Sequence, residues 1–162
     1  MGEKPLVNFS IRKAMERDAD GILECLRVAF DPYRSRYTAE GFQDSTLTSE
    51  TLRQRMKTMS ILVATDDTGE IVGTVACNVS APEEGHLRGM AVIPRWQGCG
   101  LAQQLLAAVE AELRARGCRR ATLDTTEPLQ RAIRFYERNG YRLSGKVGDF
   151  FGMPLYEYVK VL

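Results

Sequence analysis

A short apolar run, a glycine turn and a periodic helix follow one another between residues 85 and 117. The run ends at Pro94, the turn carries Gly98 and Gly100, and the helix then repeats apolar residues at helical spacing. A turn of this kind leaves free backbone N–H groups at the positive end of a helix. Such a place binds anions, especially phosphate. The sequence therefore predicts a local phosphate site where a strand passes into a helix.

The composition gives no general reason to bind anions elsewhere. The 162 residues carry a formal net charge of +1, so we expect no nucleic-acid partner. The length is that of one domain, and we expect residues 1–162 to form a single domain with its own core. The four cysteines are widely spaced and have no neighbouring histidine, which predicts neither a metal site nor a disulfide framework.

The first ten residues, MGEKPLVNFS, have no apolar core of signal-peptide length. No stretch approaches the roughly 20 apolar residues that cross a membrane. We therefore expect a cytoplasmic protein with no membrane partner. The sequence leaves the oligomeric state open, with a homodimer among the expected arrangements.

Apolar patterns of strand and helix type alternate along the chain. Alternation predicts strands over 7–13, 61–65, 70–79, 86–93, 120–125, 141–151 and 155–161. Helical spacing and capping residues predict helices over about 18–30, 49–59, 101–116 and 126–139. This order predicts an α+β fold with a mixed, mostly antiparallel sheet of about six to seven strands flanked by about four helices.

Two stretches in the first half of the chain have weaker patterns. Residues 31–49 show no clear period, and we expect a long functional loop there. The helix over 49–59 carries Arg53, Arg55 and Lys57, which we expect on a solvent-exposed face because such residues are rarely buried.

Two motifs together resemble the signatures of the GNAT superfamily of N-acetyltransferases. The turn QGCGLA at 97–102 is similar to the family's acyl-CoA-binding pattern, Gln/Arg-x-x-Gly-x-Gly/Ala. The segment AIRFYERNGY at 132–141 is similar to its second signature, a helix that ends in Tyr-x-x-x-Gly-aromatic. The resemblance covers nearly the whole chain and is strongest over 71–141.

The resemblance implies that acetyl-CoA donates an acetyl group to an amine, without a metal. The turn would hold the CoA pyrophosphate, and the strand before it would pair with the pantetheine arm as an added strand would. Two arginines on the helix of the second signature would face either the CoA phosphates or solvent. The implied donor-binding residues are Met90, Ala91, Val92, Gln97, Gly98, Cys99, Gly100, Leu101, Ala102, Arg131 and Arg134.

Tyr136 is the general acid that the resemblance implies. At ordinary values a phenol titrates near about 10 and a thiol near about 8.5, so full proton transfer to the leaving thiolate is uphill. Either the site lowers the pKa of Tyr136, or its hydroxyl mainly hydrogen-bonds the developing thiolate. Helical spacing alone is also typical of a core aromatic residue.

His86 is the candidate base for the amine proton, because it is the chain's only histidine and starts the strand before the turn. The family often has an acidic residue near this position, so His86 departs from the pattern. An ordinary strand-edge role, Glu83, Glu84 or a water chain are the alternatives. Along this strand we expect residues 86, 88, 90 and 92 to share one face.

The second signature often carries an Asn where Leu129 stands here. We expect a hydrogen bond near the pantetheine to be missing, or Thr125 or Thr126 to replace it. Cys99 has no basic partner, which disfavours a nucleophilic role. A dinucleotide site is disfavoured because Gln103 stands where its third glycine belongs.

A non-catalytic acyl-CoA-binding or sensing module on the same fold is the alternative to an enzyme. For an enzyme, the acceptor is a small-molecule or peptide amine. The resemblance places it among the first two helices, the 31–50 segment and the last two strands. The acidic and aromatic residues available there are Tyr33, Tyr37, Glu40, Phe42, Asp44, Asp149, Phe150 and Phe151.

Overall fold

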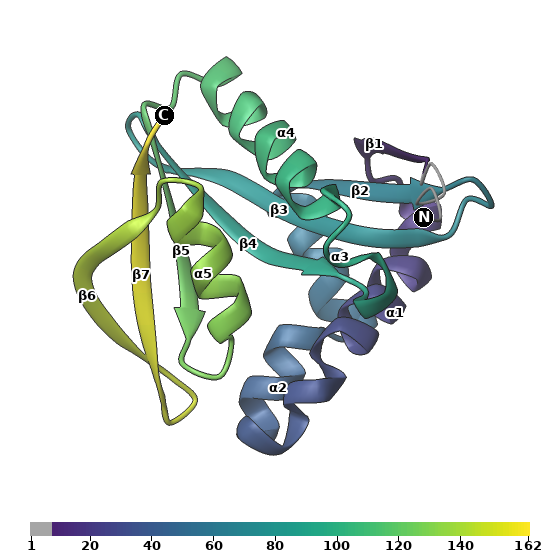
Figure 1. Cartoon of the computed structure of the whole chain (residues 1–162), viewed down its shortest axis with the longest axis horizontal. Helices are drawn as coiled ribbons and strands as arrows, with labels where there is room; N and C mark the ends of the chain where they lie inside the picture. The colour runs from purple at the N-terminus through teal and green to yellow at the C-terminus, as the bar shows by residue number, and fades with distance from the viewer. Residues whose placement is uncertain (1–7) are drawn as a thin grey trace, which may run out of the picture.

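The structure, a computed structural model, describes residues 8–162. Within them the strands are β1 (Phe9–Lys13), β2 (Ser60–Asp66), β3 (Ile71–Ala81), β4 (Glu84–Val92), β5 (Arg120–Thr126), β6 (Arg142–Phe150) and β7 (Met153–Val161). They form one seven-stranded sheet in the order β1-β2-β3-β4-β5-β7-β6 (Figure 1). Only β4 and β5 pair in parallel, which confirms the expected mixed, mostly antiparallel sheet. Val7, the expected first residue of β1, lies outside the described residues.

Five α-helices accompany the sheet in residues 8–162. They are α1 (Ala19–Phe30), α2 (Ala39–Thr46), α3 (Ser49–Thr58), α4 (Leu101–Ala115) and α5 (Gln130–Arg138). Short 3-10 helices cover Glu16–Asp18, Asp31–Arg36 and Pro94–Trp96. The last helix starts later than expected, because Leu129 N donates to Thr126 O in a turn at 3.1 Å and Pro128 lies inside that turn.

The long loop expected over 31–49 is wrong. A 3-10 helix continues α1, and α2 follows with Thr38 as its N-cap, since the Thr38 hydroxyl accepts from Gly41 N at 3.2 Å. The helix is short, and Phe42 is its one large buried side chain. So few apolar positions leave no helical period to detect in the sequence.

The core lies on both faces of the sheet, with α4 and α5 on one face and α1 and α3 on the other (Figure 1). Two sheet glycines allow α4 to pack closely. A Cβ at Gly73 would lie 2.8 Å from Leu105, and a Cβ at Gly85 would lie 2.5 Å from Leu113. Both leucines are fully buried. This close packing fixes where α4 begins, and therefore where the glycine turn lies.

The aromatic residue of the second signature, Tyr141, joins α4 to the end of α5. Its hydroxyl donates to the buried carboxylate of Glu110 on α4 at 2.9 Å, and Lys160 Nζ lies 2.8 Å from the same carboxylate. The Tyr141 ring meets the Tyr136 ring edge to face, with 5.8 Å between centroids. The buried cluster therefore positions the tyrosine that the sequence singles out.

An ion pair fixes the entry into α1. Arg12 Nη1 and Nη2 donate to the Asp18 carboxylate at 2.7 and 2.8 Å, and Met15 N donates to it at 2.7 Å. The hydrogen bonds from Arg12 lower the pKa of Asp18 to about 2, against the opposing effect of its burial. The native state therefore favours the ionised carboxyl.

Replacing Asp18 with Asn is expected to lower the free energy of unfolding by about 1–2 kcal/mol at pH 7. A lowered pKa stabilises the fold fully above the unfolded value of about 3.9, and this contribution disappears as the pH falls through the folded value. Urea unfolding at several pH values should show the difference shrinking towards pH 2. The matched control is Glu24→Gln, which removes the exposed pair with Arg27 and should change little. A difference equally large at pH 7 and at the acid end would contradict the assignment.

Candidate active site

The sheet opens where β4 and β5 separate (Figure 1). Their parallel pairing runs from Glu84 opposite Arg120 to Leu87 opposite Leu123 and then ends. Beyond it, β4 keeps β3 as a neighbour on one edge only, with Val92 opposite Gly73. The other edge of β4 is therefore free to accept an extended ligand as an added strand.

A β-bulge at Gly89 kinks β4 beside this opening. Arg88 stands opposite Ala76 and Ala91 opposite Thr74, so two residues of β4 face one residue of β3. Gly89 has a φ of 62°, a conformation that favours glycine. The extra residue places 86, 88 and 91 on one face. The expected shared face of 86, 88, 90 and 92 is therefore wrong, because a bulge shifts the period-two alternation by one.

A cavity of about 150 Å³ lies between the free edge of β4 and α5. Seven of the eleven predicted donor-site residues line this cavity, together with the predicted acid, Tyr136. Its lining includes Met90, Ala91, Val92, Gln97, Gly98, Ala102, Arg131 and Tyr136. Cys99, Gly100, Leu101 and Arg134 do not line it. We call this space the donor cavity.

The glycine turn has the conformation that an anion site needs. Gly98 and Gly100 have φ values of 78° and 89°, and Gly100 caps α4 without a side-chain hydrogen bond to the first turn. The first N–H groups of α4 therefore have no side-chain cap. Gln97 Nε2 donates to Val92 O at 3.1 Å and ties the turn to the end of β4. Leu101 is fully buried and anchors the start of the helix.

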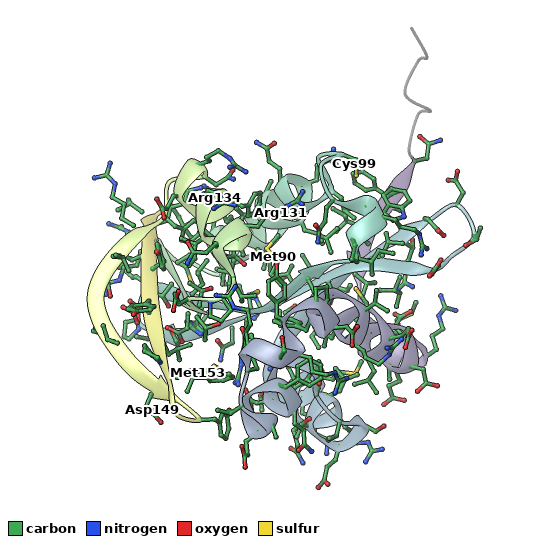
Figure 2. The ribbon with its side chains drawn as sticks, turned by 60° about the horizontal axis from the view of Figure 1, so that its bottom comes forward. Met90, Cys99, Arg131, Arg134, Asp149 and Met153 are labelled. Atoms are coloured by element: carbon green, nitrogen blue, oxygen red, sulfur yellow. The ribbon has the colours of Figure 1, made fainter. Side chains whose placement is uncertain are left out.

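The remaining predicted donor-site residues differ in placement. Arg131 and Arg134 are both exposed on α5, and Arg131 lines the donor cavity (Figure 2). Cys99 is exposed, and its thiol donates to Trp96 O at 2.8 Å. Among residues 8–162 no base is hydrogen-bonded to this thiol, in keeping with the argument against a nucleophile.

Tyr136 lies at the junction between the donor cavity and the space beyond it. Its side chain is 9% exposed, and no group within residues 8–162 hydrogen-bonds its hydroxyl. Burial raises the pKa of Tyr136 above its ordinary value. This direction is opposite to the one that would ease full proton transfer. Of the two expected roles, proton transfer from a phenol of lowered pKa and a hydrogen bond to the thiolate, the free protein therefore favours the hydrogen bond.

A second cavity, of about 300 Å³, opens on the other side of the junction and is here called the acceptor cavity. A small cavity of about 90 Å³ adjoins both, since it shares Met90 and Tyr136 with the first and Arg88 and Asp124 with the second. The three spaces follow the separation of β4 and β5. A ligand in the donor cavity can therefore meet a ligand in the acceptor cavity across the small cavity, which Tyr136 lines.

His86 lines the acceptor cavity and lies next to a carboxyl group. Its Nδ1 lies 2.8 Å from the Thr122 hydroxyl, and its Nε2 lies 3.5 Å from Asp124 Oδ2. The Thr122 hydroxyl can donate to Gly85 O at 3.4 Å, which would leave Nδ1 as the donor and Nε2 as the acceptor. Burial raises the pKa of Asp124, His86 opposes this effect, and Glu157 adds to it.

The sequence analysis missed Asp124. Its signal was an acidic residue inside a strand that, after Arg120, is otherwise made of apolar residues and threonines. The alternative bases lie elsewhere: Glu83 and Glu84 pair with Arg119 and Arg120 at 3.3 and 2.8 Å, at the closed end of the β4–β5 pair. Neither glutamate lines the cavities described above.

Helix α2 and the β6–β7 hairpin border the acceptor cavity. Thr38 donates to Phe151 O at 2.9 Å, and a Cβ at Gly41 would lie 3.2 Å from Met153, which Figure 2 labels near the hairpin tip. Of the residues expected to bind the acceptor, Tyr37, Asp44 and Phe150 line this cavity and Tyr33 lines the donor cavity. Glu40, Phe42, Asp149 and Phe151 line neither.

The threonines expected to replace the missing Asn lie in the same wall. The Tyr37 and Thr126 hydroxyls are hydrogen-bonded at 2.6 Å. Thr125 Oγ1 is buried and has no partner within the described part of the chain. The Thr125 hydroxyl is therefore a buried polar group that the described residues leave without a hydrogen bond.

The expectation that Arg55 is solvent-exposed is wrong, although Arg53 and Lys57 are exposed as expected. Arg55 is buried and lines the acceptor cavity. Its spacing of three from the buried Leu52 places it on the inward face of α3. This spacing was the available signal, and the rarity of buried arginines outweighed it.

The sequence model of the Acetyltransferase (GNAT) family matches residues 20–141. An aminoglycoside N(6')-acetyltransferase type 1 from Stenotrophomonas maltophilia is 38% identical over 71 residues, which are 44% of this chain and 46% of that protein. An acetyltransferase of Agrobacterium fabrum is 36% identical over 93 residues, covering 56% and 63%. The chain thus matches less than two thirds of either relative's length.

The fold is also that of PaiA N-acetyltransferase from Thermoplasma acidophilum, solved in complex with coenzyme A. The TM-score is 0.79 at 17% sequence identity, covering 96% of this chain and 99% of the other. The chain belongs to the GNAT acetyltransferase family.

Between residues 8 and 162, no group of three or more His, Cys, Asp or Glu side chains is placed to hold a metal ion. No helix in the same range has the length and apolar character needed to cross a bilayer.

Proposed function

We propose that this protein transfers an acetyl group from acetyl-CoA to a primary amine, by direct attack within a ternary complex. The observation that carries this proposal is that the small cavity, which Tyr136 lines, adjoins both the donor cavity and the acceptor cavity. Direct attack requires the thioester and the amine to be bound together in adjoining sites.

Three features of the donor cavity favour acetyl-CoA. The glycine turn and the start of α4 offer N–H groups to a pyrophosphate. The free edge of β4 over Met90–Val92 offers backbone groups to the amides of pantetheine. Arg131 adds a positive charge beside the cavity.

The reacting groups lie on either side of the junction. On the acceptor side, His86 Nε2 would accept the proton of the amine, and Asp124 would stabilise the imidazolium that forms. The amine attacks the thioester carbonyl, the C–S bond breaks, and the thiolate leaves. On the donor side, the Tyr136 hydroxyl would donate a hydrogen bond to the developing thiolate.

The test is a screen of primary amines, including aminoglycosides because of the relative from S. maltophilia. Free-thiol release from acetyl-CoA and mass spectrometry of the acetylated amine are measured together. We expect stoichiometric thiol and acetyl-amine with at least one acceptor class. Tight CoA binding with no release for any amine would instead favour a non-catalytic acyl-CoA sensor.

Replacing His86 with Gln is expected to lower kcat/KM for the amine by about 10- to 100-fold, because a bound water replaces a side-chain base only in part. The acidic limb of the pH profile should flatten in this variant, while the KM for acetyl-CoA stays unchanged. Glu84→Gln is the control, because Glu84 lies at the closed end of the strand pair and should leave the profile intact. An unaltered pH profile in His86→Gln would remove His86 as the base.

A further inference from the structure

The acceptor cavity contains a buried cation without a partner. Arg55 is 9% exposed, and its guanidinium has no hydrogen bond or ion pair with any group in residues 8–162. It lies directly against the bulge of β4, since a Cβ at Gly89 would be 2.5 Å from Arg55 Nη1. A second side chain would therefore not fit between the guanidinium and the strand.

This arrangement is costly for the free protein. A buried charge is normally paired, because desolvation without compensation is strongly unfavourable. Burial is the largest cause that lowers the pKa of Arg55 to about 10; nearby Arg88 adds to this effect and Asp44 opposes it. Arg55 is thus still a cation at neutral pH. Residues 8–162 place no carboxylate within ion-pair distance of Arg55, so the cavity is suited to a ligand that supplies an anion.

The other charges in the cavity indicate where that anion lies. Arg88 is paired with Asp44 at 3.2 Å, so its charge is largely balanced. Asp124 lies beside His86 at the β5 side of the cavity. The cavity therefore presents an unbalanced cation on the α3 side and a carboxylate on the β5 side. Thr125, whose buried hydroxyl has no partner within residues 8–162, also lines the cavity.

We propose that the acceptor is an amino acid: an amine that also bears a carboxylate, which Arg55 binds. This inference rests on the proposed function. The planar guanidinium matches a carboxylate with two parallel hydrogen bonds. A volume of about 300 Å³ suits a small molecule of this kind. One uncompensated cation balances one negative charge and repels a polycation, so an aminoglycoside is disfavoured.

The experiment compares amino acids with their carboxamides in pairs, so that each pair differs only in the negative charge. A third arm contains aminoalkyl phosphates, and a fourth contains aminoglycosides. Free-thiol release gives kcat and KM, and calorimetry in the presence of CoA gives binding independently of turnover. We expect at least one amino acid to exceed its amide roughly 10- to 100-fold in kcat/KM, as a charged hydrogen-bonded pair requires.

Arg55→Gln should remove this preference by raising the KM for the amino acid. The KM for the amide and the KM for acetyl-CoA should stay unchanged. Arg55→Lys should keep part of the preference for the amino acid, because lysine keeps the positive charge but loses the two parallel N–H donors of the guanidinium. Arg53→Gln is the matched control, since Arg53 is exposed on the same helix and should leave the preference intact. Thermal unfolding of all three variants shows whether they fold.

Equal use of acids and amides by the wild type would overturn the inference, as would a preference for phosphates or aminoglycosides. An equal loss for acid and amide in a folded Arg55→Gln protein would also overturn it. Failure of the proposed function gives a different result: no thiol release with any amine. In that case, carboxylate-dependent binding by calorimetry would still support the Arg55 site, and its absence would reject it.

Discussion

Replacing Tyr136 with Phe is expected to lower kcat roughly 100- to 1,000-fold and to leave the dissociation constant of CoA unchanged. The hydroxyl is the only group removed, and it has no hydrogen-bond partner among residues 8–162. The ring keeps its contacts with Phe135 and Tyr141, at centroid distances of 5.5 and 5.8 Å. The variant should therefore be as stable as the wild type, and single-turnover kinetics will isolate the chemical step.

Tyr141→Phe is the matched control, because it removes a hydroxyl from the adjacent ring. That hydroxyl donates to the buried Glu110, so its loss should lower the free energy of unfolding by about 1–2 kcal/mol. Turnover at a temperature where the fold is intact should remain near the wild-type value. Opposite effects are thus expected. Tyr136→Phe should lose activity but keep its stability, and Tyr141→Phe should lose stability but keep its activity. Unchanged turnover in Tyr136→Phe would end the assignment of Tyr136 as the acid.

Replacing Gly100 with Val is expected to raise the KM for acetyl-CoA roughly 10- to 100-fold, because left-handed backbone strain of this kind costs about 1–3 kcal/mol. Gly100 has a φ of 89° at the N-cap of α4. A β-branched side chain disfavours this conformation, so the turn must rotate and its N–H groups must change direction. Calorimetry with CoA will measure the same loss without turnover.

Gly69→Val provides a control with the same backbone strain in another place. Gly69 has a φ of 86° in the turn between β2 and β3, and a Cβ at either glycine would meet no atom within 4 Å. Both variants should lose similar stability, yet only Gly100→Val should weaken CoA binding. Equal CoA affinity in the two variants would show that the shape of the glycine turn is not what binds the donor.

The glycine turn, α4 and the tyrosine motif could be predicted because their residues are neighbours in the chain. Gly98, Gly100 and the apolar spacing of α4 together encode a turn that opens a helix. Tyr136 and Tyr141 lie within one short motif, because α5 ends at Arg138 and Tyr141 N donates to Tyr136 O at 3.0 Å in the turn that follows. Local conformation follows from adjacent residues, so these features were visible in the sequence.

The acceptor side could be predicted only in part. Tyr37, Asp44 and Phe150 were expected near the acceptor and do line its cavity, but α2 was missed because it has too few apolar positions. The period-two pattern of β4 gave no sign of the bulge at Gly89, since a bulge is defined by pairing with another strand.

The sequence by itself determined the glycine turn, the helix that follows it and the position of Tyr136 on a helix. Only the tertiary structure decided that His86 meets Asp124, and that Arg55 lies buried against Gly89. The physical reason is that periodicity orients a segment relative to its own axis. Which side chains meet across a cavity depends on how distant strands and helices pack, and on whether a charge finds a partner there.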